Sequence, residues 1–140
     1  MIKKIIITAV VAFLLFCSCQ TAPVAWDDSI PIEKMATVRF VNMNIDSFNG
    51  IAVTKFNWVN IPAGEARLGG LVLINHAGAT FRTSGMEFTC QFDAGREYIV
   101  QGTAQDLQWG VSVYEGSKGS HINADHKIAF IPFKNQPVFH

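Results

Sequence analysis

From Ala36 onward the chain consists of short runs rich in Val, Ile, Phe and Thr, which are separated by Gly, Asn, Asp and Pro. None of these runs keeps a helical period over the length of a helix, and β-branched and aromatic residues favour strands. The pattern therefore predicts an all-β domain. We expect about seven strands, at residues 37–43, 51–58, 66–74, 86–92, 97–101, 107–114 and 127–133.

Two of the expected strands alternate clearly between apolar and polar residues. The apolar positions, each set on one face of its strand, are Met86, Phe88, Cys90 and Phe92 in the first and Leu107, Trp109, Val111 and Val113 in the second. Strands of this kind pack one face on a core and leave the other to solvent. Because segments long enough for crossover helices are missing, the sequence favours a single antiparallel β-sandwich, with a small closed β-barrel as the alternative.

Turn residues mark the ends of the expected strands. Each turn contains a Gly that can adopt a positive φ angle; the turns are Asn49-Gly50, 62–65, 93–96 and 115–119. They predict connections that are mostly hairpin-like.

The N-terminus resembles an export signal. Lys3 and Lys4 give it a positive start, and an apolar run of 13 residues follows at 5–17. A membrane-spanning helix needs about 20 apolar residues, whereas the apolar region of a signal peptide has about 7 to 15. We therefore expect residues 1–18 to be a signal peptide.

The end of the apolar run resembles the lipobox of bacterial lipoproteins, in which a Cys after a small residue is acylated and becomes the first residue. Cys19 follows the small Ser18, whereas Cys17 follows the bulky Phe16. The resemblance implies lipidation (palmitate or a similar acyl chain) at Cys19, with Cys17 as the other choice. A plain secretory signal and an uncleaved anchor are the alternatives.

The expected mature chain begins with a tether at 19–35 and continues as the β-sandwich domain at 36–140. Cleavage after residue 18 removes Lys3 and Lys4 and no acidic residue, which leaves 9 basic and 11 acidic side chains. Trp26 is the one large aromatic residue of the tether, and we expect its ring to dock on the domain. With Cys19 acylated, Cys90 has no partner for an intrachain disulfide.

Two segments resemble the turn pattern of small bacterial lipoproteins with transthyretin-like or PEGA-like β-sandwich domains of uncharacterised function. They are Ile61-Pro62-Ala63-Gly64-Glu65 and Phe92-Asp93-Ala94-Gly95-Arg96-Glu97-Tyr98. The resemblance covers about 38–100 and implies the sandwich fold. It carries no functional residue to this chain.

No sequence motif names a reaction. The chain lacks G-x-S-x-G, H-E-x-x-H and the phosphate-binding P-loop, and Gly69-Gly70 is typical of a bulge or a close backbone approach. Cys90 lies between apolar residues and reads as a buried, inert thiol. His121, Asp125 and His126 are weak metal candidates, but their spacing is no known ligand pattern, so we expect exposed loop residues, with no metal and no other cofactor.

Aromatic residues exceed what one buried face per strand requires. Surplus apolar surface often marks a partner site, and aromatic side chains are preferred there. We expect most of these aromatic side chains to pack in the core. The weak binding candidates are Phe56, Trp58, Trp109 and Tyr114.

These observations predict a noncatalytic, membrane-anchored lipoprotein that acts as a binding module of the bacterial cell envelope. Its partners would be the membrane, through the lipid, and an envelope or host protein. The balanced charge argues against a nucleic-acid partner. We expect the outer membrane, on its periplasmic or its exposed side. The alternative is a small envelope hydrolase or metal-dependent enzyme with an unrecognised site.

Overall fold

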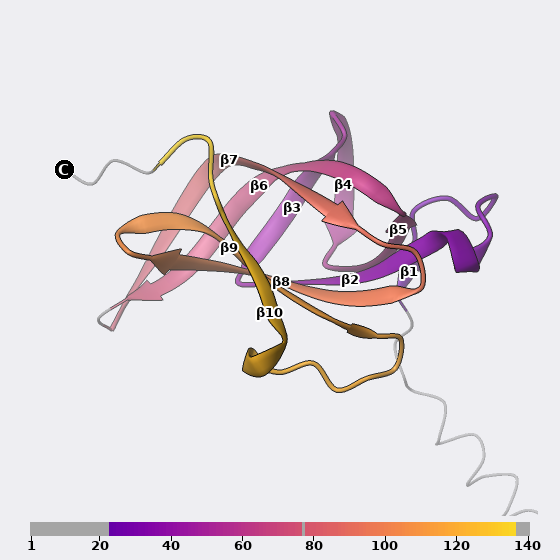
Figure 1. The fold of residues 1–140 in the computed structure, drawn as a ribbon. Helices are drawn as coiled ribbons and strands as arrows, with labels where there is room; N and C mark the ends of the chain where they lie inside the picture. Colours follow the sequence, from indigo (N-terminus) through magenta and orange to yellow (C-terminus); the bar gives the residue numbers. More distant parts are fainter. Residues whose placement is uncertain (1–22, 77, 137–140) are drawn as a thin grey trace, which may run out of the picture.

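A computed structural model describes residues 23–76 and 78–136 (Figure 1). These residues form strands and two short 3₁₀ turns, η1 (Ile32–Lys34) and η2 (Ala124–His126). The strands are β1 (Val24–Ala25), β2 (Met35–Val41), β3 (Met43–Phe48), β4 (Ile51–Phe56), β5 (Trp58–Pro62), β6 (Gly64–His76), β7 (Ala79–Phe92), β8 (Arg96–Gln105), β9 (Gln108–Ser117) and β10 (Lys127–Pro132).

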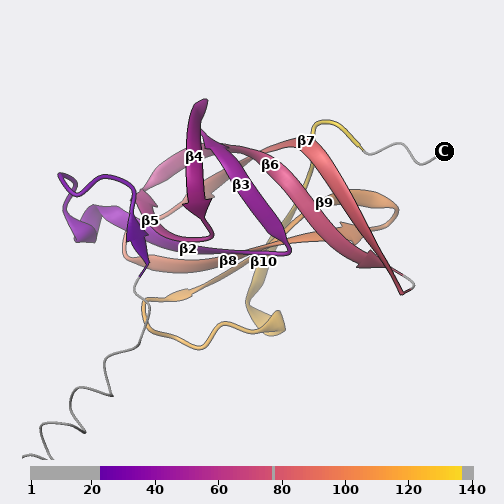
Figure 2. The ribbon, with the colours of Figure 1, turned by 180° about the vertical axis from the view of Figure 1, so that it is seen from behind.

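Two sheets face each other across one core. The six-stranded sheet has the order β1-β5-β2-β8-β9-β10, and the four-stranded sheet has the order β4-β3-β6-β7. Figures 1 and 2 show the two sheets as separate layers seen from opposite sides. Over the described residues the strands do not close into a barrel, so the predicted all-β sandwich is confirmed and the barrel alternative is not adopted.

The sheets are mixed rather than wholly antiparallel. β2 pairs with β8 in parallel, with Val38 opposite Tyr98, and β1 pairs with β5 in parallel. The other pairs are antiparallel. Parallel pairing becomes possible because the chain changes sheets at the turns before β6 and β8, which the sequence pattern suggested were hairpins. Among the predicted turns, Asn49-Gly50 does join two paired strands, β3 and β4.

Some strand boundaries also differ from the prediction. The expected strand 37–43 ends at Asn42, which has a φ of 56° and redirects the chain into β3 in the other sheet. The expected strand 51–58 is likewise divided at Asn57 into β4 and β5. Leu107 does not share the buried face of its strand, because it lies in the β8–β9 turn with a φ of 67° and is fully exposed.

The segment predicted as a tether is folded onto the domain from Val24 onward. Val24 pairs with Val59, and the backbone N–H of Trp26 donates to the carbonyl oxygen of Asn60 at 2.9 Å. The indole of Trp26 lies 4.7 Å from the ring of Phe48 and 5.7 Å from that of Phe56, between centroids. The docking of Trp26 is confirmed, and β1 and Trp26, which lie before the predicted domain start at residue 36, pack on the sandwich.

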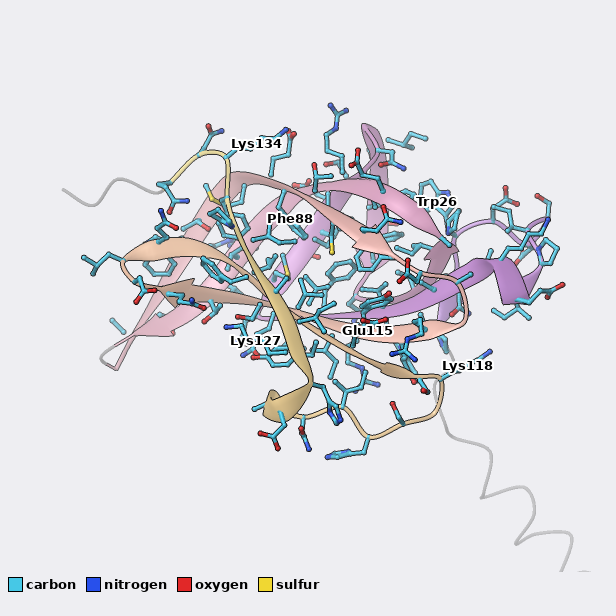
Figure 3. The ribbon with its side chains drawn as sticks, in the orientation of Figure 1. Trp26, Phe88, Glu115, Lys118, Lys127 and Lys134 are labelled. Carbon is cyan, nitrogen blue, oxygen red and sulfur yellow. The ribbon has the colours of Figure 1, made fainter. Side chains whose placement is uncertain are left out.

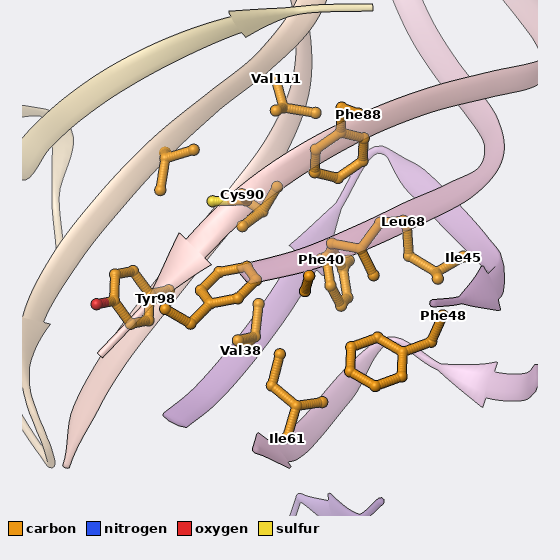
Figure 4. Packing of buried hydrophobic residues seen from close by; sticks show 14 of the residues in the cluster. Val38, Phe40, Ile45, Phe48, Ile61, Leu68, Phe88, Cys90, Tyr98 and Val111 are labelled. Atoms are coloured by element: carbon orange, nitrogen blue, oxygen red, sulfur yellow. The ribbon is translucent and has the colours of Figure 1, made fainter. Parts of the chain in front are cut away.

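Both sheets contribute to a continuous core (Figure 4). The predicted inward face of β7 is confirmed, since Met86, Phe88, Cys90 and Phe92 are all buried. Burying each large apolar side chain stabilises the fold by about 1.5–3 kcal/mol. Largest among the fully buried side chains are Tyr98, Phe88, Phe92, Ile45, Ile61 and Leu68.

Gly70 marks a close approach between β6 and β3, as the Gly69-Gly70 pair predicted. A Cβ atom at position 70 would collide with the backbone carbonyl of Asn44. The pairing of β3 and β6 is also irregular here, because the register shifts between Ile45 and Ser47. The glycine therefore allows the two backbones to meet where the ladder is distorted.

Candidate binding groove on the six-stranded sheet

Side chains on the outer face of the six-stranded sheet form a continuous row. Each member is the direct cross-strand neighbour of the next, in the order Trp58, Arg39, Ile99, Tyr114 and Lys127. They face outward because the alternate positions of the same strands, such as Val38 and Val100, fill the core. The row places aromatic, aliphatic and cationic groups side by side across five strands.

The first contact in the row is between Arg39 and Trp58. The guanidinium carbon of Arg39 lies 4.6 Å from the centroid of the Trp58 ring. A cation at this distance is attracted by the aromatic face, which is worth about 0.5–1 kcal/mol at an exposed site. The ion pairs of the described residues are Arg96–Glu115 and Lys134–Glu87, so no described carboxylate pairs with Arg39. Its N–H donors are therefore available to a ligand.

The loop between β9 and β10 folds over this face (Figure 1). Its approach depends on Gly116, because a Cβ atom there would collide with Ser120 and with Ile122. The carboxylate of Glu97 accepts a hydrogen bond from the backbone N–H of Gly119 at 2.7 Å. These contacts hold the loop against β8 and β9.

Two hollows on this face share Ile99 and Ile122 in their linings. The larger, of about 250 Å³, is lined by the side chains of the first part of the row and by the loop, namely Arg39, Trp58, Glu97, Ile99, Ser120 and His121. The smaller, of about 190 Å³, is lined by Ile99, Gln101, Tyr114, Asn123 and Ala124. We call the two hollows together the outer-face groove.

The groove combines opposite charges with apolar surface. Arg39 supplies fixed donors, the Glu97 carboxylate accepts hydrogen bonds, and Ser120 and His121 can do either. Trp58 and Ile99 supply flat or apolar contact area. Such a surface suits an extended ligand with both donors and acceptors, whereas a strongly charged polymer would meet one repelling group.

Comparison with known proteins adds no residue role to the groove. No protein-family model, curated protein or solved structure matches the chain. What the groove can bind therefore follows from its own side chains.

The structure separates the four aromatic binding candidates. Trp58 and Tyr114 lie in the outer-face groove. Phe56 does not, because its side chain is only 4% exposed and packs in the core. Trp109 is partly buried against the core, and its backbone N–H donates to the Gln136 side chain at 2.7 Å. Phe56 and Trp109 therefore pack against the core and lie outside the outer-face groove.

His121, Asp125 and His126 are all exposed, in the β9–β10 loop and the η2 turn. Nδ1 of His126 accepts a hydrogen bond from the backbone N–H of Asn123 at 3.1 Å, and Asn123 accepts from the N–H of Asp125. This reciprocal capping engages Nδ1 of His126 and fixes η2. Among the described residues, no three His, Cys, Asp or Glu side chains gather as a metal site requires. His121 instead reaches the groove.

A second polar cluster joins β8 and β9 near Glu115, which Figure 3 labels. The guanidinium of Arg96 donates to the Glu115 carboxylate at 2.8 Å, and the hydroxyl group of Tyr98 donates to the same oxygen at 3.3 Å. Burial, followed by the nearby acidic groups, raises the pKa of Tyr98 to about 12. These groups satisfy one another, so the cluster is structural.

Cys90 has the properties of an inert thiol. It is buried, and burial raises its pKa to about 11. The thiol therefore stays protonated near neutral pH and is a poor nucleophile.

The predicted acylation site lies outside the described residues, as do Cys17 and the rest of the signal segment. Within residues 23–76 and 78–136, no helix has the length and apolarity of a membrane span.

The sequence could not have identified the whole groove. Arg39 and Ile99 meet Trp58 and Tyr114 only through the pairing of β2 with β8, which no local pattern encodes. The one available signal was the alternation of the strand, since Arg39 is the single charged residue in a run of mostly apolar ones and so marks the outward-facing positions.

Proposed function

We propose that this protein is a noncatalytic binding module, anchored in the bacterial cell envelope by an acylated Cys19, which holds its partner in the outer-face groove. The observation that carries the proposal is the stack of Arg39 on Trp58 beside a hollow of about 250 Å³. An arginine without a carboxylate partner among the described residues, backed by an aromatic ring, is typical of binding surfaces.

The state of the reactive side chains supports a noncatalytic role over the hydrolase alternative. Cys90 is buried with a raised pKa, and His126 is engaged in capping η2. Nucleophilic catalysis needs a nucleophile within hydrogen-bond reach of a base. His121 makes no contact of this kind with the described residues, so the groove offers recognition groups instead.

The ligand class follows from the groove's mixed chemistry. A partner that lies across β5, β2 and β8 would stack on Trp58 and Ile99 and exchange hydrogen bonds with Arg39 and Glu97. An extended segment of an envelope or host protein has this combination of backbone donors, acceptors and apolar side chains.

The binding test compares matched pairs of variants. The double variant with Arg39→Ala and Trp58→Ala should no longer retain an envelope protein on the immobilised domain. The control is a double variant at two exposed positions of the other sheet, Arg82→Ala and Gln91→Ala, and it should retain the same protein as the wild type does. Equal retention by both pairs would refute the groove as the binding surface. Cleavage of the retained protein would support the enzyme alternative.

The anchor is tested separately. Cys19→Ala should move the protein from the detergent phase to the aqueous phase in a Triton X-114 partition, whereas Cys17→Ala should leave it in the detergent phase. The reverse pattern would assign the lipid to Cys17. Unchanged partitioning of both variants would overturn the lipoprotein proposal.

A further inference from the structure

The chain enters the sandwich at a side where both sheets have open edges. β1 is the edge strand of the six-stranded sheet, and β4 is the edge strand of the four-stranded sheet. Between them lies a hollow of about 170 Å³. Its lining contains no charged side chain and comprises Val24, Ala25, Trp26, Ala52, Val53, Thr54, Phe56 and Val59.

Large apolar side chains are exposed around this hollow. Val24 of β1 is 59% exposed, and Ile51, the first residue of β4, is 57% exposed. A concentration of exposed apolar surface beside an uncharged hollow marks a contact site. We call β1, β4 and the hollow between them the entry edge.

The length of chain before β1 limits how far the entry edge can be from the anchor. Cys19 and Val24 are five positions apart in the sequence. A chain spans at most about 3.3–3.6 Å per residue, so these two positions are within about 18 Å of each other in any conformation. A flexible tether up to residue 35 would have allowed about three times this distance, but β1 and Trp26 remove that freedom.

We infer that the entry edge rests on the surface of the lipid bilayer in which Cys19 is anchored. The inference depends on the lipidation at Cys19 proposed above. The acyl chains hold Cys19 at the membrane surface, and the short link then brings Val24 and the uncharged hollow into the headgroup region. Interfacial segments penetrate this region to a depth of roughly 5–10 Å.

The contact is interfacial rather than an insertion into hydrocarbon. The outer edges of β1 and β4 expose backbone N–H and C=O groups, which need water or headgroups as partners. Asp27 and Asp28 follow Trp26 directly and are exposed, and charged groups are costly in the bilayer centre. The apolar side chains therefore lie at the boundary while the strand edges and carboxylates stay hydrated.

This placement also positions the outer-face groove. Trp58 is adjacent in sequence to Val59, the strand partner of Val24. The groove therefore begins on the strand next to the membrane-bound edge, and its ligand is met close to the bilayer surface rather than far from it.

The test places an environment-sensitive fluorophore at single introduced cysteines in the full-length, acylated protein. Thr54→Cys reports on the entry edge, and Leu107→Cys reports on the β8–β9 turn at the opposite end of the sandwich (Figures 1 and 2). Unmodified protein controls for labelling of Cys90. The protein is reconstituted into vesicles of phosphatidylethanolamine and phosphatidylglycerol that contain nitroxide-labelled lipid.

We expect the nitroxide lipid to quench the fluorophore at position 54 and to leave that at position 107 nearly unchanged. Val24→Glu should weaken the quenching at position 54 while the protein still floats with the vesicles. Leu107→Glu, a matched change at another exposed apolar residue, should have no effect on it.

Three outcomes would overturn the inference, and they are distinguishable. Flotation with equal quenching at both positions would leave the anchor intact and disprove the contact. Flotation with position 54 unquenched and a doubled particle mass in detergent would assign the entry edge to a second copy of the chain. Failure to float would disprove the anchor and the contact together.

Discussion

The hydroxyl oxygen of Tyr98 accepts a hydrogen bond from the backbone N–H of Asp93 at 2.8 Å. Asp93 lies in the turn that takes the chain from the four-stranded to the six-stranded sheet, and Tyr98 lies in β8 with its ring buried. The same hydroxyl group donates to Glu115 in β9. One side chain thus ties the connection between the sheets to two strands.

Removing this hydroxyl group should destabilise the domain. Tyr98→Phe leaves the N–H of Asp93 without its partner, and we expect a loss of about 1–2 kcal/mol in the free energy of unfolding. Urea denaturation measures the change. The control is Tyr114→Phe, because the Tyr114 hydroxyl group makes no hydrogen bond to the described residues; we expect this variant to lose less than about 0.5 kcal/mol in the free energy of unfolding. Equal losses in the two variants would contradict the role given to Tyr98.

Cys90 should make the domain less stable in alkaline solution. Its folded-state pKa is about 11, raised by burial from the ordinary value of 9.0. Between these values the unfolded chain releases the thiol proton and the folded chain retains it, so stability falls as the pH rises from 9 to 11. Two pKa units correspond to roughly 3 kcal/mol at most.

The variant Cys90→Ala isolates this effect. It should be somewhat less stable at neutral pH because it leaves a small cavity. Its stability should nevertheless fall less steeply between pH 9 and 11, a range given by the two pKa values of Cys90. Denaturation midpoints measured across this range provide the comparison. Parallel curves, or rapid maleimide labelling of the folded wild type, would show that the thiol is not buried.

Leu107 occupies a backbone conformation that suits glycine. Its φ is 67°, and its fully exposed side chain gains nothing from packing. Because the left-handed region costs a side-chain-bearing residue about 1–2 kcal/mol, Leu107→Gly should stabilise the protein by about 1 kcal/mol. Asp106→Gly, at a φ of 50°, should gain less because Asp tolerates this region better. A lower melting temperature for Leu107→Gly would contradict the turn geometry.

Gly70 should tolerate no side chain. In Gly70→Ala the new Cβ meets the backbone of Asn44, so β3 and β6 must separate, at a cost of about 1–3 kcal/mol or more. Gly95→Ala is the control, since its Cβ meets nothing and only the positive φ of 73° opposes it. Thermal unfolding of the two variants distinguishes steric overlap from backbone strain. A smaller loss for Gly70→Ala would contradict the close approach.

Local patterns predicted the elements of the fold well. The alternation through Phe88 and Cys90 identified the buried face of β7. Asn49-Gly50 identified a turn, and Gly69-Gly70 identified a close backbone approach. What failed depended on contacts distant in sequence. Asn42 and Asn57 break two predicted strands because the chain changes sheets there. Asn42 also shows that a residue in the left-handed region need not be glycine when the flanking strands impose the turn.

The candidate site was less predictable than the fold. Trp58 was selected as a surplus aromatic residue, but so was Phe56, and only tertiary packing shows that Phe56 faces the core. Arg39 became significant through its stack on Trp58, a neighbour created by the pairing of β2 with β5. The composition of a strand indicates which side chains are surplus, whereas the register decides where they are exposed.

The parallel pairing of β2 with β8 has a consequence for the rate of folding. Val38 and Tyr98 are opposite one another although 60 positions separate them, whereas β6–β7 and β8–β9 pair locally. Such topologies fold slowly, in milliseconds to seconds, because long loops must close before any contact compensates for the lost entropy. In a chain that emerges from its N-terminus, β5 can pair with one edge of β2 early, but the other edge stays unpaired until residues 97–101 of β8 have followed. During this interval the open edge of β2, which carries the apolar Val38 and Phe40, is exposed to aggregation, and a chaperone would protect it.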